Sequence, residues 1–162
     1  MRHNQDLIVK TFDKLSAAEL YEILRLREAV FIVEQNCPYP EADGKDPEAV
    51  HLWYGGEDGR VAAYLRLYHK SDESGTVQVG RVVISAAVRG TGLGRRLLHE
   101  GVGYAAREMG AERLYLEAQV YAVGFYRKEG FEVTSGEFLE DGIPHVQMRR
   151  NKEVEPIKRT DK

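Results

Sequence analysis

Three glycines alternate with other residues in the stretch Arg89-Gly90-Thr91-Gly92-Leu93-Gly94-Arg95, between two basic side chains. The apolar residues 77–84 precede this stretch, and a run with helical periodicity, residues 95–109, follows it. The first N–H groups of a helix have no intrahelical partner, and the helix dipole places partial positive charge there. Glycines allow an anion to approach the backbone, because no Cβ stands in the way. The stretch therefore predicts a phosphate-binding loop. The alternative is a turn that only packs a strand tightly against a helix.

The spacing of these glycines excludes two familiar phosphate-binding motifs. They form G-x-G-x-G, which differs from the G-x-G-x-x-G of dinucleotide-binding folds and from the G-x-x-x-x-G-K-[ST] of nucleoside triphosphatases. No Lys-Ser or Lys-Thr follows the last glycine. The motif alone does not identify the ligand.

A longer pattern around the loop resembles a known superfamily. Arg89-x-x-Gly92-x-Gly94 after an apolar strand is similar to the [QR]-x-x-G-x-[GA] signature of the GNAT N-acetyltransferases, which use acetyl-CoA. Residues 122–131 read Ala-Val-Gly-Phe-Tyr-Arg-Lys-Glu-Gly-Phe and are similar to a second GNAT segment, A-x-x-[FL]-Y-x-x-x-G-F. Residues 26–41 and 141–146 resemble the ElaA-type branch. The similarity covers most of residues 7–150.

The resemblance implies where acetyl-CoA would bind. Its pyrophosphate would contact the loop backbone, assisted by the charges of Arg89 and Arg95, although Arg95 could equally lie on a solvated helix face. Its pantetheine arm would pair with strand backbone, which requires the central strand and the following strand to splay apart. Gln119, at the end of that following strand, stands where the superfamily often has Asn. The implied cofactor-binding residues are Val82, Ile84, Arg89, Gly90, Thr91, Gly92, Leu93, Gly94, Arg95, Gln119 and Tyr126.

Acetyl transfer from a thioester to an amine also needs a proton for the departing thiolate. The resemblance assigns this donation to Tyr126, whose phenol, with a pKa near 10, stays protonated at neutral pH. The alternative is a core role, because Phe125 and Phe131 lie close in sequence.

The amine must lose a proton before it attacks, so a general base is expected. Some members of the superfamily have a Glu on the central strand, but the corresponding residue here is Gln78, which cannot accept a proton. The candidates are Glu117, Glu34 and His145, with His51 as a further titratable group. Each could instead be a surface carboxylate or a satisfied histidine, and a water chain would also suffice.

An acidic loop follows the first predicted helix. It contains Glu34, Tyr39, Glu41, Asp43 and Asp46. Such a loop beside a cleft could attract a cationic amine, because like charges around a cleft focus the field. The alternative is a solvated loop whose charges contribute only to solubility.

Length and composition limit the class of protein. A chain of 162 residues is long enough for one domain with a sizeable core and too short for two ordinary ones. A net charge of −3 argues against a nucleic-acid partner. No apolar run is long enough to cross a bilayer, and no signal peptide is evident. The single cysteine, Cys37, suits a reducing compartment, so we expect a cytoplasmic location.

The elements that must position these residues can be predicted from periodicity and turn signals. We expect a mixed α/β fold of the GNAT type, with a central, mostly antiparallel sheet of about seven strands flanked by helices. A capping box, Ser16 with Glu19, begins the first helix, and Asp58-Gly59 marks a hairpin. The expected strands are 7–12, 50–54, 61–68, 76–84, 114–119, 131–134 and 145–149, and the helices are 17–31, 95–109 and 121–129. Residues 1–150 form the domain; residues 1–5 are a loose lead-in, and 151–162 are a polar, frayed tail.

The sequence thus predicts a cytoplasmic N-acetyltransferase that uses acetyl-CoA in a direct ternary complex, without a metal. Small amines, peptide N-termini and lysine side chains are all open as acceptors, and a homodimer is open because dimers are common in the superfamily. Two alternatives stand beside this prediction. Gln78 and Gln119 leave room for a non-catalytic acyl-CoA sensor, and the acyl group could differ from acetyl.

Overall fold

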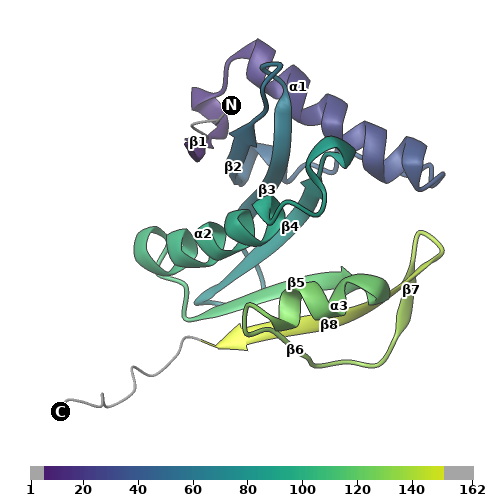
Figure 1. The fold of residues 1–162 in the computed structure, drawn as a ribbon. Coiled ribbons are helices and arrows are strands. Elements are labelled where there is room, and N and C mark those ends of the chain that lie inside the picture. Colours follow the sequence, from purple (N-terminus) through teal and green to yellow (C-terminus); the bar gives the residue numbers. More distant parts are fainter. Residues whose placement is uncertain (1–5, 152–162) are drawn as a thin grey trace.

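The computed structural model describes residues 6–151, which build one eight-stranded sheet (Figure 1). The strand order is β1-β2-β3-β4-β5-β8-β6, and β7 pairs with β8. All neighbours are antiparallel except β4 and β5, which confirms a mixed, mostly antiparallel sheet. The strands are β1 (Ile8–Thr11), β2 (Val50–Gly55), β3 (Val61–His69), β4 (Thr76–Ile84), β5 (Arg113–Gln119), β6 (Glu132–Val133), β7 (Phe138–Glu140) and β8 (Ile143–Asn151).

Helices cover both faces of the sheet. Helix α1 (Ala17–Arg27) packs on one face, where Ile23, Tyr64 and Val83 form a small core. Helices α2 (Leu93–Glu108) and α3 (Val123–Arg127) lie on the opposite face, over a larger core. The predicted capping box begins α1: the N–H of Glu19 donates to Ser16 Oγ at 3.0 Å, and the N–H of Ser16 donates to Glu19 Oε1 at 2.9 Å.

The sheet opens between its two parallel strands. β4 and β5 pair only through Thr76–Gln78 and Arg113–Tyr115, although β4 continues to Ile84. Tyr64 pairs with Val83 and Arg66 with Gly80, so β4 has one residue more than β3 over this interval. This bulge contains Arg81, a non-glycine residue at φ +50°. Bulges bend a strand, and beyond this one β4 diverges from β5 (Figure 1). The predicted splay is confirmed.

Several predicted boundaries are wrong. The first helix does not continue regularly to residue 31: a π-helical turn, Glu28–Glu34, follows α1, with the N–H of Gln35 donating to Val30 O at 3.1 Å. Strand β7 was not predicted, although Asp141-Gly142, with φ of +52° and +79°, is a hairpin signal. Asn151 belongs to β8 rather than to a tail. The predicted lead-in and the rest of the predicted tail lie outside the described residues. Within residues 6–151, no helix has both the length and the apolar composition needed to cross a membrane.

Candidate active site

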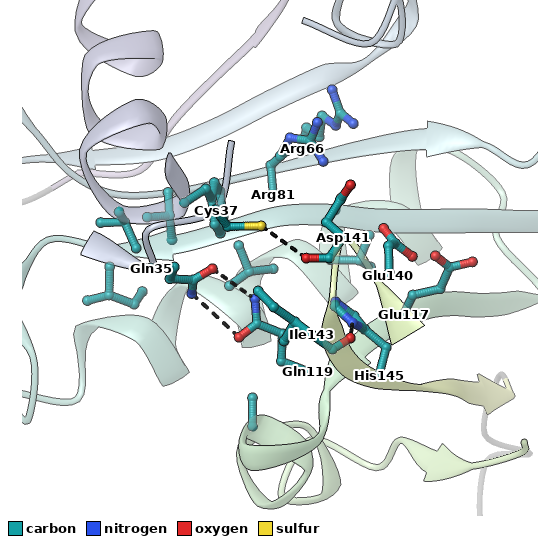
Figure 2. A pocket seen from close by; sticks show the side chains of 18 of the residues that line it. Gln35, Cys37, Arg66, Arg81, Glu117, Gln119, Glu140, Asp141, Ile143 and His145 are labelled. Atoms are coloured by element: carbon teal, nitrogen blue, oxygen red, sulfur yellow. Dashed lines mark hydrogen bonds between the residues drawn. The ribbon is translucent and has the colours of Figure 1, made fainter. Parts of the chain in front are cut away.

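A cavity of about 850 Å³ opens where β4 and β5 diverge (Figure 2). The bulged half of β4 forms one wall, and the ends of β5 and β8 form the other. The π-helical turn and the loop after it close one side, and α3 and the β7–β8 turn close another. Of the predicted catalytic residues, Glu34, Glu117, Tyr126 and His145 all line this cavity.

The backbone of β4 presents a free edge to the cavity. The N–H of Ser85 donates to Ala62 O on β3 at 2.8 Å, and Val83 also pairs with β3. Because backbone groups alternate in direction along a strand, those of Val82 and Ile84 point to the opposite edge, which β5 has left. An extended ligand could therefore add to β4 at the two residues predicted to bind the pantetheine arm.

The glycine-rich loop begins α2 beside this edge. Gly90 and Gly92 have φ of +80° and +89°, and a Cβ on either would meet nothing within 4 Å. Gly94 differs, because a Cβ there would lie 2.8 Å from Ile84 Cδ1. Gly94 therefore allows α2 to pack closely against Ile84 of β4. The other two glycines give the loop its left-handed turns and leave open space above it. Of the predicted loop contacts, only Arg89 also lines the cavity; Gly90, Thr91, Gly92, Leu93, Gly94 and Arg95 are not among its lining residues.

Arg89 and Glu34 form an ion pair at the cavity. Arg89 Nη1 lies 2.8 Å from Glu34 Oε2, and Nη2 lies 2.9 Å from Oε1. Arg89 Nε also donates to Ile84 O at 3.1 Å. The hydrogen bonds from Arg89 lower the pKa of the Glu34 carboxyl, so Glu34 is ionised at neutral pH and is a weak base there. The prediction that Glu34 acts as the general base loses support.

Tyr126 lies on α3 at the cavity. The residue is 9% exposed and lies edge-on to Phe125 and Phe131, as a core tyrosine would. No residue among 6–151 hydrogen-bonds its hydroxyl, however, and the side chain lines the cavity. Burial raises the pKa of this phenol above its usual value, so it remains protonated across the physiological range.

Gln119 pairs with Gln35 across the cavity (Figure 2). Gln35 Nε2 donates to Gln119 Oε1 at 3.4 Å, and Gln119 Nε2 donates to Gln35 Oε1 at 3.2 Å. A second link joins the loop after the π-helical turn to the β7–β8 turn, from Cys37 Sγ to the carbonyl oxygen of Asp141 at 3.2 Å. Cys37 is therefore held in a hydrogen bond.

His145 faces Gln119 in the β5–β8 register. Its Nδ1 lies 2.7 Å from the carbonyl oxygen of Ile143, which can only accept, so the proton of the neutral ring is on Nδ1. The lone pair is then on Nε2. His51, in contrast, is fully buried away from the cavity, between the Tyr64 hydroxyl and the Asp46 carbonyl. His51 is therefore not a base for this site.

Two carboxyl groups meet at the far end of the cavity. Glu117 on β5 and Glu140 on β7 lie side by side, within hydrogen-bond reach of each other (Figure 2). The Tyr115 hydroxyl donates to Glu117 Oε2 at 2.7 Å. Both residues are exposed to solvent at this end of the cavity. Partial desolvation, with the hydrogen bond to Glu117 and its charge, raises the pKa of Glu140 to about 7. The pair can hold one proton near neutrality.

The acidic loop is not a free anionic surface. Asp46 binds both Arg27 and Arg66, each at 2.9 Å, and Glu41 binds Arg27 and Arg81. Asp43 also pairs with Arg66 and Arg81, so three carboxylates are matched by three guanidinium groups. Arg27 and Arg66 are 0% and 2% exposed. The interpretation of this loop as a steering surface for cationic amines is therefore wrong for Glu41, Asp43 and Asp46, because arginines already neutralise them.

Sequence reasoning missed three features of the site. Glu140 is one of 26 acidic residues, and only its position before Asp141-Gly142 could have placed it in a hairpin. Gln35 reaches the cavity through the π-helical turn, which has no sequence signal. Arg81 lies in the β4 bulge, and the only hint was the glycine before it. Among the described residues, no group of three or more His, Cys, Asp or Glu side chains is placed to hold a metal ion.

Comparison with known proteins agrees with this architecture. Residues 26–152 match the family model described as an acetyltransferase (GNAT) domain. A UPF0039 protein of Schizosaccharomyces pombe is 40% identical over 147 residues, which are 90% of this chain and 97% of that protein. Protein ElaA of Escherichia coli is 37% identical over 139 residues, 85% of this chain and 90% of ElaA.

Solved structures extend the agreement to the fold. The crystal structure of an acyl-CoA N-acyltransferase from Pseudomonas aeruginosa is 41% identical, with a TM-score of 0.82 over 90% of this chain and 99% of that one. The crystal structure of Escherichia coli ElaA has a TM-score of 0.84 at 34% identity, over 91% of this chain and 99% of ElaA. The GNAT fold and the ElaA-like resemblance predicted from the sequence are confirmed. The chain belongs to the GNAT acetyltransferase family, among relatives of the ElaA and UPF0039 type.

Proposed function

We propose that the protein transfers the acetyl group of acetyl-CoA to a primary amine by direct attack in a ternary complex. One observation carries the proposal: the β4 edge at Val82 and Ile84, which β5 does not cover, and Tyr126, whose hydroxyl has no hydrogen-bond partner within residues 6–151, line one cavity. An extended chain that ends in a thioester fits this combination, because strand-like pairing would hold the chain and a phenol would serve its sulfur.

The residues present suit acetyl-CoA, which supplies an activated acyl thioester. The space above Gly90 and Gly92 and the start of α2 suit a pyrophosphate, and Arg89 supplies a cation beside them. The backbone of Val82 and the N–H of Ile84 offer hydrogen bonds for an arm that contains amides, whereas the Ile84 carbonyl already accepts from Arg89 Nε. The amide pair of Gln35 and Gln119 offers further hydrogen bonds across the cavity.

The side chains of the cavity divide the proton transfers between them. Tyr126 would donate its hydroxyl proton to the sulfur that leaves, because its raised pKa keeps it protonated. An acceptor amine must lose a proton, and His145 Nε2, the Glu117–Glu140 pair or a water chain would take it. Cys37 is not placed as an acyl carrier, since its thiol donates to a backbone carbonyl. The primary-amine acceptor and the cytoplasmic location remain predictions.

Calorimetric titration with acetyl-CoA tests the proposal. The wild type should bind, and Gly92→Asp should not, because the new carboxylate would lie where the pyrophosphate is expected. Gly59→Asp is the matched control: Gly59 has φ of +80° and, like Gly92, open space, but it lies in the β2–β3 turn. No binding to folded wild type would refute the proposal. Binding without turnover of any amine in a library would instead support the acyl-CoA sensor.

A further inference from the structure

We propose that Glu117 and Glu140 together bind the ammonium form of the acceptor and that Glu140 takes its proton, so that the acceptor is an aliphatic primary amine that is cationic at neutral pH. This inference rests on the proposed function and adds the acceptor class and the base.

The acidic side chains around the cavity differ in whether a basic side chain neutralises them. Five acidic residues line it, namely Glu34, Asp43, Glu117, Glu140 and Asp141. Glu34 and Asp43 are bound by arginines. Within residues 6–151, no basic side chain lies within salt-bridge distance of Glu117 or Glu140. The loop that could have attracted a cation is neutralised, so the negative charge that remains for a ligand is at Glu117, Glu140 and the adjacent Asp141.

Tyr126 is a second polar group of the cavity, independent of the acidic pair. Tyr126 is buried to nine-tenths, lines the same cavity, and has no hydrogen-bond partner among the described residues. An unpartnered polar group in such a position points to a ligand. A phenol that can donate and a carboxyl pair that can accept therefore share one cavity. A thioester sulfur could accept the proton of the phenol, and an ammonium group could donate to the carboxyl pair. A thioester and a cationic amine bound together would therefore satisfy both sites.

The surroundings of Glu140 explain why it, rather than Glu117, would move the proton. Glu117 already accepts from the Tyr115 hydroxyl, which leaves one oxygen for a cation. Partial desolvation, the hydrogen bond to Glu117 and the charges of Glu117 and Asp141 raise the pKa of Glu140 to about 7, and the charge of Arg81 opposes them. A general base is most effective at pH 7 when its pKa is near that value.

The proton balance is complete without another reactant. The R–NH₃⁺ group gives one proton to a Glu140 carboxylate oxygen, and the neutral nitrogen attacks the thioester carbon to form the C–N bond. The C–S bond breaks, and the thiolate takes the Tyr126 proton. The nitrogen then loses its extra proton to the phenolate, through water, and Glu140 releases its own to solvent. The products are the amide, the thiol and one proton.

Four full-length variants and two probes test the inference. The probes are 1,5-diaminopentane and its uncharged analogue 1,5-pentanediol. The variants are Glu140→Gln, Glu117→Gln, His145→Gln and the control Glu137→Gln, a neighbouring exposed residue that does not line the cavity. Thiol release is followed at saturating acetyl-CoA, and calorimetry in buffers of different ionisation enthalpy measures the protons released when a probe binds.

We expect the diamine to bind the wild type and to release a proton near pH 7, whereas the diol should not bind. Glu140→Gln should abolish the proton release and lower kcat roughly 100-fold with the acetyl-CoA Kd unchanged. Glu117→Gln should mainly raise KM, roughly tenfold. Glu137→Gln should match the wild type.

Other results would overturn the inference. Equal binding of the diol and the diamine, or no binding of the diamine at millimolar concentration, would exclude a cationic acceptor at this pair. If Glu140→Gln kept full activity and proton release while His145→Gln lost both, the base would be His145. Failure of the proposed function would be recognised separately, because the wild type would then not bind acetyl-CoA in the calorimetric titration.

Discussion

Arg89 and Glu34 join the glycine-rich loop to the π-helical turn by two N–H···O bonds of 2.8 and 2.9 Å. The pair is exposed, with 40% of the Arg89 side chain and 49% of the Glu34 side chain accessible. Exposed pairs contribute only about 0–1 kcal/mol to stability. The pair is therefore better placed to set the charge presented to a ligand than to stabilise the fold.

This geometry predicts opposite effects of two substitutions on acetyl-CoA binding. Arg89→Gln should weaken binding roughly tenfold, because a charge-assisted hydrogen bond to phosphate would be lost. Glu34→Gln should leave binding equal or tighter, because Arg89 is released from a competing carboxylate. Calorimetry measures both. Arg25→Gln, which breaks the comparably exposed pair with Glu22, is the control and should change nothing. Equal losses in the two variants at the cavity would show that the pair is only structural.

Tyr126→Phe should lower the rate of acetyl transfer while leaving the stability of the fold nearly unchanged. The hydroxyl has no partner among the described residues, so its removal should change the free energy of unfolding by less than about 0.5 kcal/mol. We expect kcat to fall roughly 10- to 100-fold while the acetyl-CoA Kd is kept. Tyr64→Phe is the control for stability: its buried hydroxyl bonds His51, and its loss should cost about 1–3 kcal/mol. Urea unfolding and thiol-release kinetics measure the two effects. Unchanged kcat in Tyr126→Phe would remove the tyrosine from the mechanism.

The parts of the fold with local signals could be predicted from the sequence. Ser16 and Glu19 form the expected capping box because their spacing alone determines it. The β2–β3 hairpin and the loop before α2 also follow from local patterns, whereas the place of β8 between β5 and β6 does not. The π-helical turn and β7 were missed, since a three-residue strand with Leu139 exposed has no hydrophobic alternation to detect.

The site was less predictable because its chemistry depends on contacts between distant segments. Glu117 and Glu140 are 23 positions apart, and nothing in their neighbours indicates that they meet. The loop carboxylates look free in the sequence, but Arg27 and Arg66 reach them from α1 and β3. The sequence shows which side chains carry a charge, but it does not show which side chains of opposite charge neutralise them in the fold.

Gly94 allows α2 to approach β4, which predicts the effect of a methyl group there. A Cβ at Gly94 would lie 2.8 Å from Ile84 Cδ1 and 3.1 Å from its Cγ1. Ile84 must shift, so Gly94→Ala should lower the free energy of unfolding by about 1–3 kcal/mol and weaken acetyl-CoA binding at the β4 edge. Gly124→Ala, in α3, meets nothing within 4 Å and should stabilise the protein by about 0.5–1 kcal/mol. Urea unfolding distinguishes the two. A neutral Gly94→Ala would show that Ile84 moves freely.

The buried ion network predicts how stability depends on pH. Asp46 lies between Arg27 and Arg66, and its hydrogen bonds to them lower its pKa in spite of the opposing effect of burial. The arginines likewise lower the pKa of Asp43 to about 2, from an ordinary value near 3.8. A carboxyl with a depressed folded-state pKa stabilises the protein above its unfolded value, and this contribution is lost as the pH falls through the folded value. Stability should therefore decline between about pH 4 and pH 2.

Asp46→Asn tests the origin of that decline. The substitution keeps the shape but leaves two buried guanidinium groups short of negative charge, which should cost about 3–5 kcal/mol at pH 7. Its stability should then fall less steeply with acid than that of the wild type, because one of the titrating carboxyls is absent. Asp72→Asn breaks the exposed pair with Lys70 and should cost less than about 1 kcal/mol. Urea unfolding at pH 7, 4 and 3 provides the comparison. A loss in Asp46→Asn as small as that in Asp72→Asn would mean that water replaces the carboxylate, and the loop would then not depend on the network for its position beside the cavity.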